Sequence, residues 1–397
     1  MAATLIIVTP APRHILPAIV AAQLAGTSLW FAGNAVAPDL QARAGLTAEV
    51  LGDMTSAVQL GFIAGTLVFS FLALADRFSP RAIFLASAVL GAACNAATCL
   101  AGAHLWLLLL LRFATGFFLA GIYPVGMKIA SGWFHRDLGR ALGFLVGALV
   151  LGTATPHLIG HSLPWESVIL SVSAIAVLGG LIMYRFVPDG PYLQAGAGFD
   201  PTALLSIFRS PEFRASSFGY FGHMWELYAF WAFVPVYLAA HVSPEAVALS
   251  VSLWSFLIIG AGAVGCVLGA MLVRRYGSAR IAFFQLGTSG LCCLLSPLAF
   301  WLPQPAATGY LLFWGVVVVG DSPQFSALNA RYAPPHLVGS ALTIVNCIGF
   351  AISVVSIQLL KSALPIVGAQ FMFLLLIPGP LLGLTALQRL VRTRKPT

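Results

Sequence analysis

Residues 72–81 read Leu-Ala-Leu-Ala-Asp-Arg-Phe-Ser-Pro-Arg, and this charged segment joins two apolar runs, 50–74 and 82–102. A membrane-spanning helix needs about 20 predominantly apolar residues, and each run is long enough. A short charged loop between two such runs predicts a helical hairpin that crosses a membrane twice.

The composition extends this prediction to the whole chain. Of the 397 residues, 59% are hydrophobic and 8% are charged, and the mean hydropathy is +0.95. A soluble protein has about 45–50% apolar and about 25% charged residues. The composition therefore excludes a soluble enzyme, a disordered regulator and a cytosolic nucleic-acid binder, and we expect an all-α polytopic membrane protein.

Twelve apolar runs separated by short polar breaks are expected to span the bilayer. They cover residues 15–37, 50–74, 82–102, 105–131, 141–162, 166–186, 215–239, 246–272, 280–302, 307–330, 338–361 and 365–388. The longest break, 187–214, contains four prolines near the middle of the chain and is typical of a linker. We therefore expect a six-helix bundle over 1–186, a cytoplasmic linker over 187–214, and a second six-helix bundle with a short cytoplasmic tail over 215–397.

The distribution of basic residues predicts the orientation. With a cytoplasmic N-terminus, 17 of the 20 Lys and Arg residues fall in cytoplasmic segments, Arg43 and Lys361 fall outside, and Arg112 lies within a helix. This positive-inside bias predicts an even number of spans with both termini in the cytoplasm. A bacterial inner membrane is the expected location.

The two halves of the chain repeat one another. Residues 121–124 and 320–323 share a Gly-x-x-Pro pattern at an offset of 199, and residues 139–142 and 339–342 share Gly-x-Ala-Leu at an offset of 200. Offsets close to half the chain length indicate a duplicated six-helix unit, as in many secondary transporters.

The segment 72–81 also resembles the loop between helices 2 and 3 of the major facilitator superfamily. That family has Gly-x-Leu-Ala-Asp-Arg-x-Gly-Arg-Arg; Asp76, Arg77 and Arg81 match it, while both glycines are replaced. Arg112 to Gly116 is similar to the Arg-x-x-x-Gly pattern of helix 4 in the family.

Two further segments bear on this resemblance. Residues 34–38, Asn-Ala-Val-Ala-Pro, look like the end of helix 1 in the family, whereas residues 147–152 lack the Gly-Pro-x-x-Gly-Gly antiporter signature of helix 5. The resemblance implies two six-helix bundles around a central cavity that opens alternately to each side. It also implies a conformational latch formed by Asp76, Arg77 and Arg81; the alternative is a solvated loop that only sets topology.

Three charged residues lie deep within predicted helices, where each charge costs at least about 2.5–3.5 kcal/mol. Arg112 could anchor a substrate carboxylate or modulate a nearby acid; alternatively, it forms a structural pair with Asp53 or Gln59. The cost is expected to be offset because these side chains face a wet passage between the halves.

Glu226 and His223 are candidates for proton coupling because they lie one turn apart in the seventh predicted helix. The cost of burying a charge favours the protonated form of Glu226, which suits a proton carrier, and His223 could relay the proton. The alternative is a neutral Glu226 that is hydrogen-bonded inside the bundle. A His-x-x-Glu pair supplies only two metal ligands, so no metal site is expected.

Asp321 is the third proton-coupling candidate. It precedes Pro323, which breaks a helix and exposes polar backbone near Gln324. Matched breaks in the two halves point to a solute site or a hinge; the alternative is a packing kink capped by Asp321.

The remaining candidates for substrate binding are polar or aromatic residues at helical spacing. With Arg112 and Gln324, the predicted set is Gln23, Trp30, Asn34, Tyr123, Tyr228 and Asn346. Apolar walls with a few polar groups suit a small organic solute. Arg112 favours an anion, whereas Glu226 and Asp321 favour a cation or a proton.

These patterns predict a proton-coupled secondary transporter of a small organic solute. A drug or metabolite efflux antiporter is one alternative, and a non-transporting receptor or scaffold is another. The chain has no Gly-x-x-x-x-Gly-Lys-Ser/Thr loop and no enzyme motif, so we expect no cofactor, no catalytic residues and no nucleic acid. Its expected partners are the solute, protons and the lipid bilayer, and it is expected to be a monomer.

Overall fold

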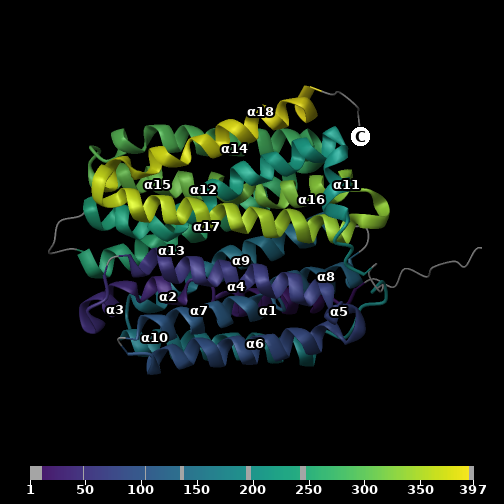
Figure 1. Ribbon diagram of the computed structural model, residues 1–397, viewed down its shortest axis with the longest axis horizontal. Coiled ribbons are helices and arrows are strands. Elements are labelled where there is room, and N and C mark those ends of the chain that lie inside the picture. Colours follow the sequence, from purple (N-terminus) through teal and green to yellow (C-terminus); the bar gives the residue numbers. More distant parts are fainter. Residues whose placement is uncertain are drawn as a thin grey trace, which may run out of the picture.

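The computed structural model describes residues 11–47, 49–102, 104–134, 138–193, 198–241 and 247–392. These residues form a bundle of helices that lie side by side along the long axis of the molecule (Figure 1). Elements up to α10 occupy the lower half of this view, and elements from α11 onward occupy the upper half.

The first half contains six crossings, of which the first and fourth are broken. The long elements are α1 (Ile15–Thr27) with α2 (Ala32–Ala35), α4 (Val50–Phe71), α6 (Pro80–Ala97), α7 (Leu105–Leu119) with α8 (Tyr123–Trp133), α9 (Leu138–Gly160) and α10 (Trp165–Phe186). The short helices α3 (Ala37–Ala44) and α5 (Leu74–Arg77) lie at the two ends of α4.

The second half repeats this plan. After the short α11 (Ala203–Ser206), its long elements are α12 (Pro211–His241), α13 (Val247–Tyr276), α14 (Ser278–Ala299), α15 (Gln304–Gly320) with α16 (Ser322–Tyr332), α17 (Val338–Phe371) and α18 (Pro378–Arg392). The C-terminal α18 packs on α12 and α14 at the top of Figure 1.

Length and hydropathy identify nine membrane-length segments in the described part of the chain. The last one, Pro335–Arg392, has 58 residues and turns at Gly368, whose φ of 73° suits glycine, so it makes two crossings. The α1–α2 pair and the 31-residue α12 bring the total to twelve. The predicted all-α fold with two six-helix bundles is confirmed.

Glycine makes the same close contact in both halves. In the first half, a Cβ added to Gly116 of α7 would lie 2.1 Å from the carbonyl oxygen of Val58 in α4. In the second half, a Cβ added to Gly315 of α15 would lie 2.0 Å from the carbonyl oxygen of Ile258 in α13. These two contacts are 199 residues apart in α7 and α15, as in the predicted repeat. Small residues allow such close helix packing where lipid supplies no hydrophobic driving force.

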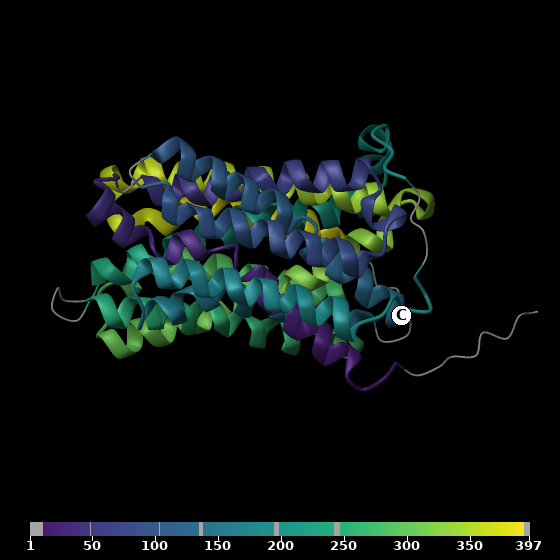
Figure 2. The same cartoon turned by 90° about the horizontal axis from the view of Figure 1, so that it is seen from below.

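Two helix pairs make the most extensive contacts between the halves, whose long helices also run along the horizontal axis in the view from below in Figure 2. Helix α9 packs against α13, and α4 packs against α17. Near the middle of the second pair, Gln59 Nε2 donates a hydrogen bond of 3.3 Å to Ser353 Oγ. The candidate site lies between the halves, where residues of α8, α9, α12, α15, α16 and α17 meet.

Candidate functional site

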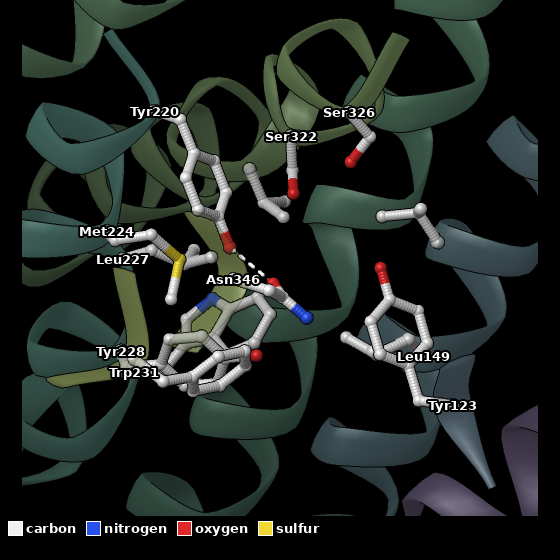
Figure 3. A pocket seen from close by; sticks show the side chains of 13 residues that line it. Tyr123, Leu149, Tyr220, Met224, Leu227, Tyr228, Trp231, Ser322, Ser326 and Asn346 are labelled. Carbon is white, nitrogen blue, oxygen red and sulfur yellow. Dashed lines mark hydrogen bonds between the residues drawn. The ribbon is translucent and has the colours of Figure 1, made fainter. Parts of the chain in front are cut away.

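A cavity lies between the two halves and is lined by both (Figure 3). Tyr123 at the start of α8 lies on one side of it, and α12, α16 and α17 form the other. Its polar lining consists of the side chains of Tyr123, Tyr220, Tyr228, Ser322, Ser326 and Asn346. Among the described residues that line the cavity, none carries a formal charge.

The cavity is small in this conformation. The volume open to the centre of a water molecule is about 30 Å³. One water needs about 10–15 Å³ on this measure, so the cavity has room for two or three waters rather than an organic solute. A solute would enter only after the halves move apart.

An aromatic cluster covers one end of the cavity. The Trp30 ring, at the break between α1 and α2, lies 4.9 Å from Phe62, 5.7 Å from Tyr228 and 5.6 Å from Phe350, measured between ring centroids. Trp30 and Phe62 belong to the first half, and Tyr228 and Phe350 belong to the second. The cluster therefore seals the interface between the halves.

Polar contacts between α4 and α17 also join the halves on either side of the aromatic cluster, toward both ends of α4. Lys361 Nζ lies 2.7 Å from Asp53 Oδ1 near the start of α4. Toward the other end of α4, the hydroxyls of Ser70 and Thr343 are 3.2 Å apart. Contacts between the halves therefore extend from one end of α4 to the other along α17.

The structure brings three of the predicted substrate-binding residues onto the cavity wall: Tyr123, Tyr228 and Asn346. Trp30 lies directly behind this wall, in ring contact with Tyr228, and its indole Nε1 donates to Gln59 Oε1 at 3.2 Å. The other four predicted residues lie elsewhere.

Arg112 binds the backbone of the first crossing at the break between α1 and α2. Its guanidinium donates to the backbone carbonyls of Leu29 at 3.1 Å and Trp30 at 2.7 Å, and to Asn95 Oδ1 at 2.8 Å. The break between α1 and α2 leaves these carbonyls without helical partners, and Arg112 satisfies them. Asp53, one suggested partner of Arg112, pairs with Lys361 instead.

The remaining three predicted residues are buried within one half. Asn34 donates to Thr55 Oγ1 at 2.8 Å. Gln23 packs against α8, where a Cβ on Gly126 would lie 2.0 Å from Gln23 Oε1. Gln324 is buried beside Gly269 of α13. Their amides serve packing inside the bundles rather than the cavity wall.

The three predicted proton-coupling residues form one cluster inside the second half. His223 Nδ1 of α12 lies 2.9 Å from Asp321 Oδ1, at the junction of α15 and α16, and both side chains are fully buried. Glu226 is also fully buried, and the Cys293 thiol of α14 contacts its Oε2 at 3.5 Å. Two acids and one imidazole thus share a small region that is closed to solvent.

This cluster does not face the passage, contrary to the expectation from the sequence. Helix α12 turns one face, with Tyr220 and Met224, toward the cavity, and turns His223 and Glu226 toward the interior of its own bundle. Asp321 adjoins the cavity only through the next residue, Ser322. All three groups are therefore buried among helices of the second half.

The predicted latch residues lie together at one end of the first half. Asp76 of α5 forms an ion pair with Lys128 of α8, whose Nζ also donates to the Ala75 carbonyl at 2.8 Å. Arg81 donates to the Tyr184 carbonyl at 3.4 Å and lies over the Tyr184 ring, whereas Arg77 is exposed. The α5 loop is thereby tied to α8, the second part of the broken fourth crossing.

Several residues of the site were missed from the sequence. Three of them, Tyr220, Met224 and Trp231, lie on α12 at intervals of four and seven residues and line the cavity. Because α12 has apolar and aromatic residues on all its faces, this spacing did not single them out. Ser322 and Ser326 share one face of α16, one turn apart, and this spacing beside Pro323 was the available signal.

Comparisons with known proteins cover a large part of the chain. Residues 18–357 match the family model described as Major Facilitator Superfamily. A probable sulfoacetate transporter, SauU, of Cupriavidus necator is 25% identical over 300 residues, which are 67% of this chain and 67% of that protein. A chloramphenicol resistance protein of Streptomyces lividans is 27% identical over 209 residues, 51% of this chain and 52% of the relative.

Two solved structures share the fold. The proton:xylose symporter XylE, bound to 6-bromo-6-deoxy-D-glucose, aligns over 95% of this chain and 96% of its own with a TM-score of 0.73 at 13% identity. The human organic anion transporter MFSD10 aligns over 96% of this chain and 100% of its own with a TM-score of 0.67 at 16% identity. At these identities the likeness shows the fold alone.

Proposed function

The chain belongs to the major facilitator superfamily and is a multi-pass membrane transporter, not an enzyme, and on that premise we propose that it couples the movement of a small organic solute to protons. The proposed path of the solute is the cavity between the halves. The proposed proton-coupling residues are His223, Asp321 and Glu226.

The observation that supports coupling is the burial of three titratable side chains in one cluster. His223 and Asp321 approach to 2.9 Å with no exposed surface, and Glu226 is buried one turn from His223 on α12. A proton shared among such groups is held by the cluster as a whole. Costly groups of this kind within a membrane span are typical of ion and proton pathways.

The position of Asp321 suggests how the proton is linked to the solute. Asp321 is the residue between α15 and α16, and the next residue, Ser322, lines the cavity. A movement of α16 against α15 would change the distance from Asp321 to His223 together with the shape of the cavity wall. Broken helices at equivalent positions of two repeats serve as such sites in secondary transporters.

The test uses purified protein in liposomes. A thermal-shift screen that includes sulfoacetate and chloramphenicol identifies a stabilising compound, and its accumulation is followed with and without an imposed pH gradient. We expect accumulation above the external concentration only with the gradient. Equal final levels in the two conditions would contradict proton coupling.

A drug-export function is the second candidate, because one relative is a chloramphenicol resistance protein. The other relative is a probable sulfoacetate transporter, so the two relatives do not agree on a substrate. Resistance of cells that express this chain to chloramphenicol, lost when the protein is absent, would favour export.

The proposal includes the placement of the chain. We propose a bacterial inner membrane, both termini in the cytoplasm, a monomer, and bundles over 1–186 and 215–397 joined by the linker 187–214. The excess of basic residues in the proposed cytoplasmic segments supports this orientation.

A further inference from the structure

The chemistry of the cavity wall limits the kind of solute that it can bind. Four polar groups converge on one part of the cavity: the hydroxyls of Tyr123, Ser322 and Ser326 and the amide of Asn346 (Figure 3). They come from α8, α16 and α17, so both halves contribute. Hydroxyl and amide groups bind neutral hydroxyls and carbonyls by hydrogen bonds.

The orientation of Asn346 is fixed by a neighbour. The Tyr220 hydroxyl donates to Asn346 Oδ1 at 2.8 Å, which leaves the amide nitrogen directed into the cavity on the side of Tyr123 (Figure 3). The wall therefore presents an oriented donor, and the three hydroxyls beside it can either donate or accept.

The other part of the wall is aromatic. Tyr228 and Trp231 lie 5.3 Å apart and nearly perpendicular, and Phe350 lies 5.1 Å from Tyr228. Aromatic walls of this kind bind a flat or apolar part of a solute through a large buried area. The cavity thus has a hydrogen-bonding side and an aromatic side.

Among the described residues of this wall, none is a Lys or Arg that could neutralise an anionic solute. Arg112, the basic residue that the sequence suggested for substrate binding, donates to Asn95 and to the carbonyls of the α1–α2 break. Moving it toward a solute would leave two buried carbonyls without donors, at about 1–3 kcal/mol for each unsatisfied group. Asp321 likewise points to His223 rather than to the cavity.

We propose that the cavity binds an uncharged organic solute with at least two hydroxyl or carbonyl groups on one side and an aromatic or apolar face on the other. An ion would lose its hydration here without gaining a charged partner, which is far more costly than burying a hydrogen-bonded neutral group. The inference names the substrate class of the proposed transport site and rests on the proposed function for that role.

The test compares three compounds with one scaffold: phenylethanediol, its anionic counterpart mandelate, and its cationic counterpart phenylethanolamine. Equilibrium binding is measured at neutral pH to the full chain in lipid nanodiscs, and binding to empty nanodiscs is subtracted. We expect phenylethanediol to bind at least about tenfold more tightly than either ion, a difference of about 1.4 kcal/mol.

The variant Asn346→Asp places an anion in the wall with little change in size. We expect it to weaken phenylethanediol binding and to make phenylethanolamine bind more tightly than mandelate. The matched control is Gln304→Glu, the same change of amide to acid at an exposed residue outside the cavity, and it should retain the preference for the diol.

Three results would overturn the inference: an ion that binds the unmodified protein as tightly as the diol, no saturable binding of the diol, or equal effects of Asn346→Asp and Gln304→Glu. Binding needs no gradient, so the two proposals can fail separately. Selective binding of the diol without gradient-driven accumulation would contradict only the proposal of proton coupling. Gradient-driven accumulation of an ion would contradict only the proposed substrate class.

Discussion

His223 Nδ1 of α12 lies 2.9 Å from Asp321 Oδ1 at the junction of α15 and α16, and neither side chain has exposed surface. This contact joins α12, which contributes five residues to the cavity wall, to the helix break that adjoins the cavity. Since groups in direct contact couple energetically, a double-mutant cycle measures the link between them.

For this cycle, we expect His223→Gln and Asp321→Asn each to lower the thermal stability of the purified protein. The double variant should lose less stability than the sum of the losses of the two single variants, and the difference is a coupling energy of about 0.5–3 kcal/mol. Scanning fluorimetry of all four proteins in one detergent provides the measurement. Strictly additive losses would show that the contact contributes nothing.

Arg112 is predicted to act on stability rather than on solute charge. Arg112→Lys keeps the positive charge but loses the planar fork that reaches Asn95 and two carbonyls at once. We expect the free energy of unfolding to fall by about 1.5–3 kcal/mol for each charged hydrogen bond that the lysine does not form. The measurement is the unfolding temperature, with Arg81→Lys as the matched control. An unchanged unfolding temperature combined with lost solute binding would instead favour a substrate anchor.

The ion pair between Asp53 and Lys361 is expected to favour the closed state at that end of the cavity. Both side chains are partly exposed, so the pair contributes at most about 1 kcal/mol, or about a fivefold shift in the closed-to-open ratio. We expect Lys361→Met to increase labelling of a cysteine placed at Trp30, in a background without the native cysteines. The exchanged pair Asp53→Lys with Lys361→Asp should restore low labelling, and equal labelling in every variant would disprove this role.

Asp76 is expected to control the movement of the fourth crossing through Lys128. Its ion pair ties α5 to α8, and Tyr123 at the start of α8 lines the cavity. We therefore expect Asp76→Asn to change the ratio of inward-open to outward-open molecules, measured by spin-label distances between the ends of α4 and α17. The control is the nearby Asp189→Asn, which removes the negative charge from a carboxylate that accepts a hydrogen bond from the Ser79 hydroxyl. Identical distance distributions for Asp76→Asn and the unmodified chain would exclude a latch.

The fold could be predicted from the sequence because its signals are local or repeated. Apolar runs of membrane length and the Gly-x-x-Pro repeat do not depend on tertiary contacts, and the twelve crossings follow from them. The predicted helix boundaries were less complete: the break at 28–31 between α1 and α2 has no proline or other strong local signal. Without that break, the role of Arg112 could not be foreseen.

The site was harder to predict because it depends on helix rotation. Helix α12 has polar and aromatic residues on every side, so nothing in its sequence distinguishes the face with Tyr220 from the face with His223. Pairs such as Gln59 with Ser353 and Asp53 with Lys361 join residues about three hundred positions apart. A single sequence contains no information on such distant pairings.

The proton-coupling role of the buried cluster is tested most directly by solute-linked proton flux. Liposomes that contain the protein and a trapped pH indicator receive the compound found in the thermal-shift screen, with no other gradient imposed. We expect the unmodified chain to change the internal pH as the compound moves, and Glu226→Gln to move the compound in exchange without a pH change. Glu212→Gln, at a partly exposed residue in the first turn of the same helix and far along it from the cluster, is the control and should behave as the unmodified chain. Equal pH changes with Glu226→Gln and Glu212→Gln, or solute uptake without any pH change in the unmodified protein, would contradict proton coupling by this cluster.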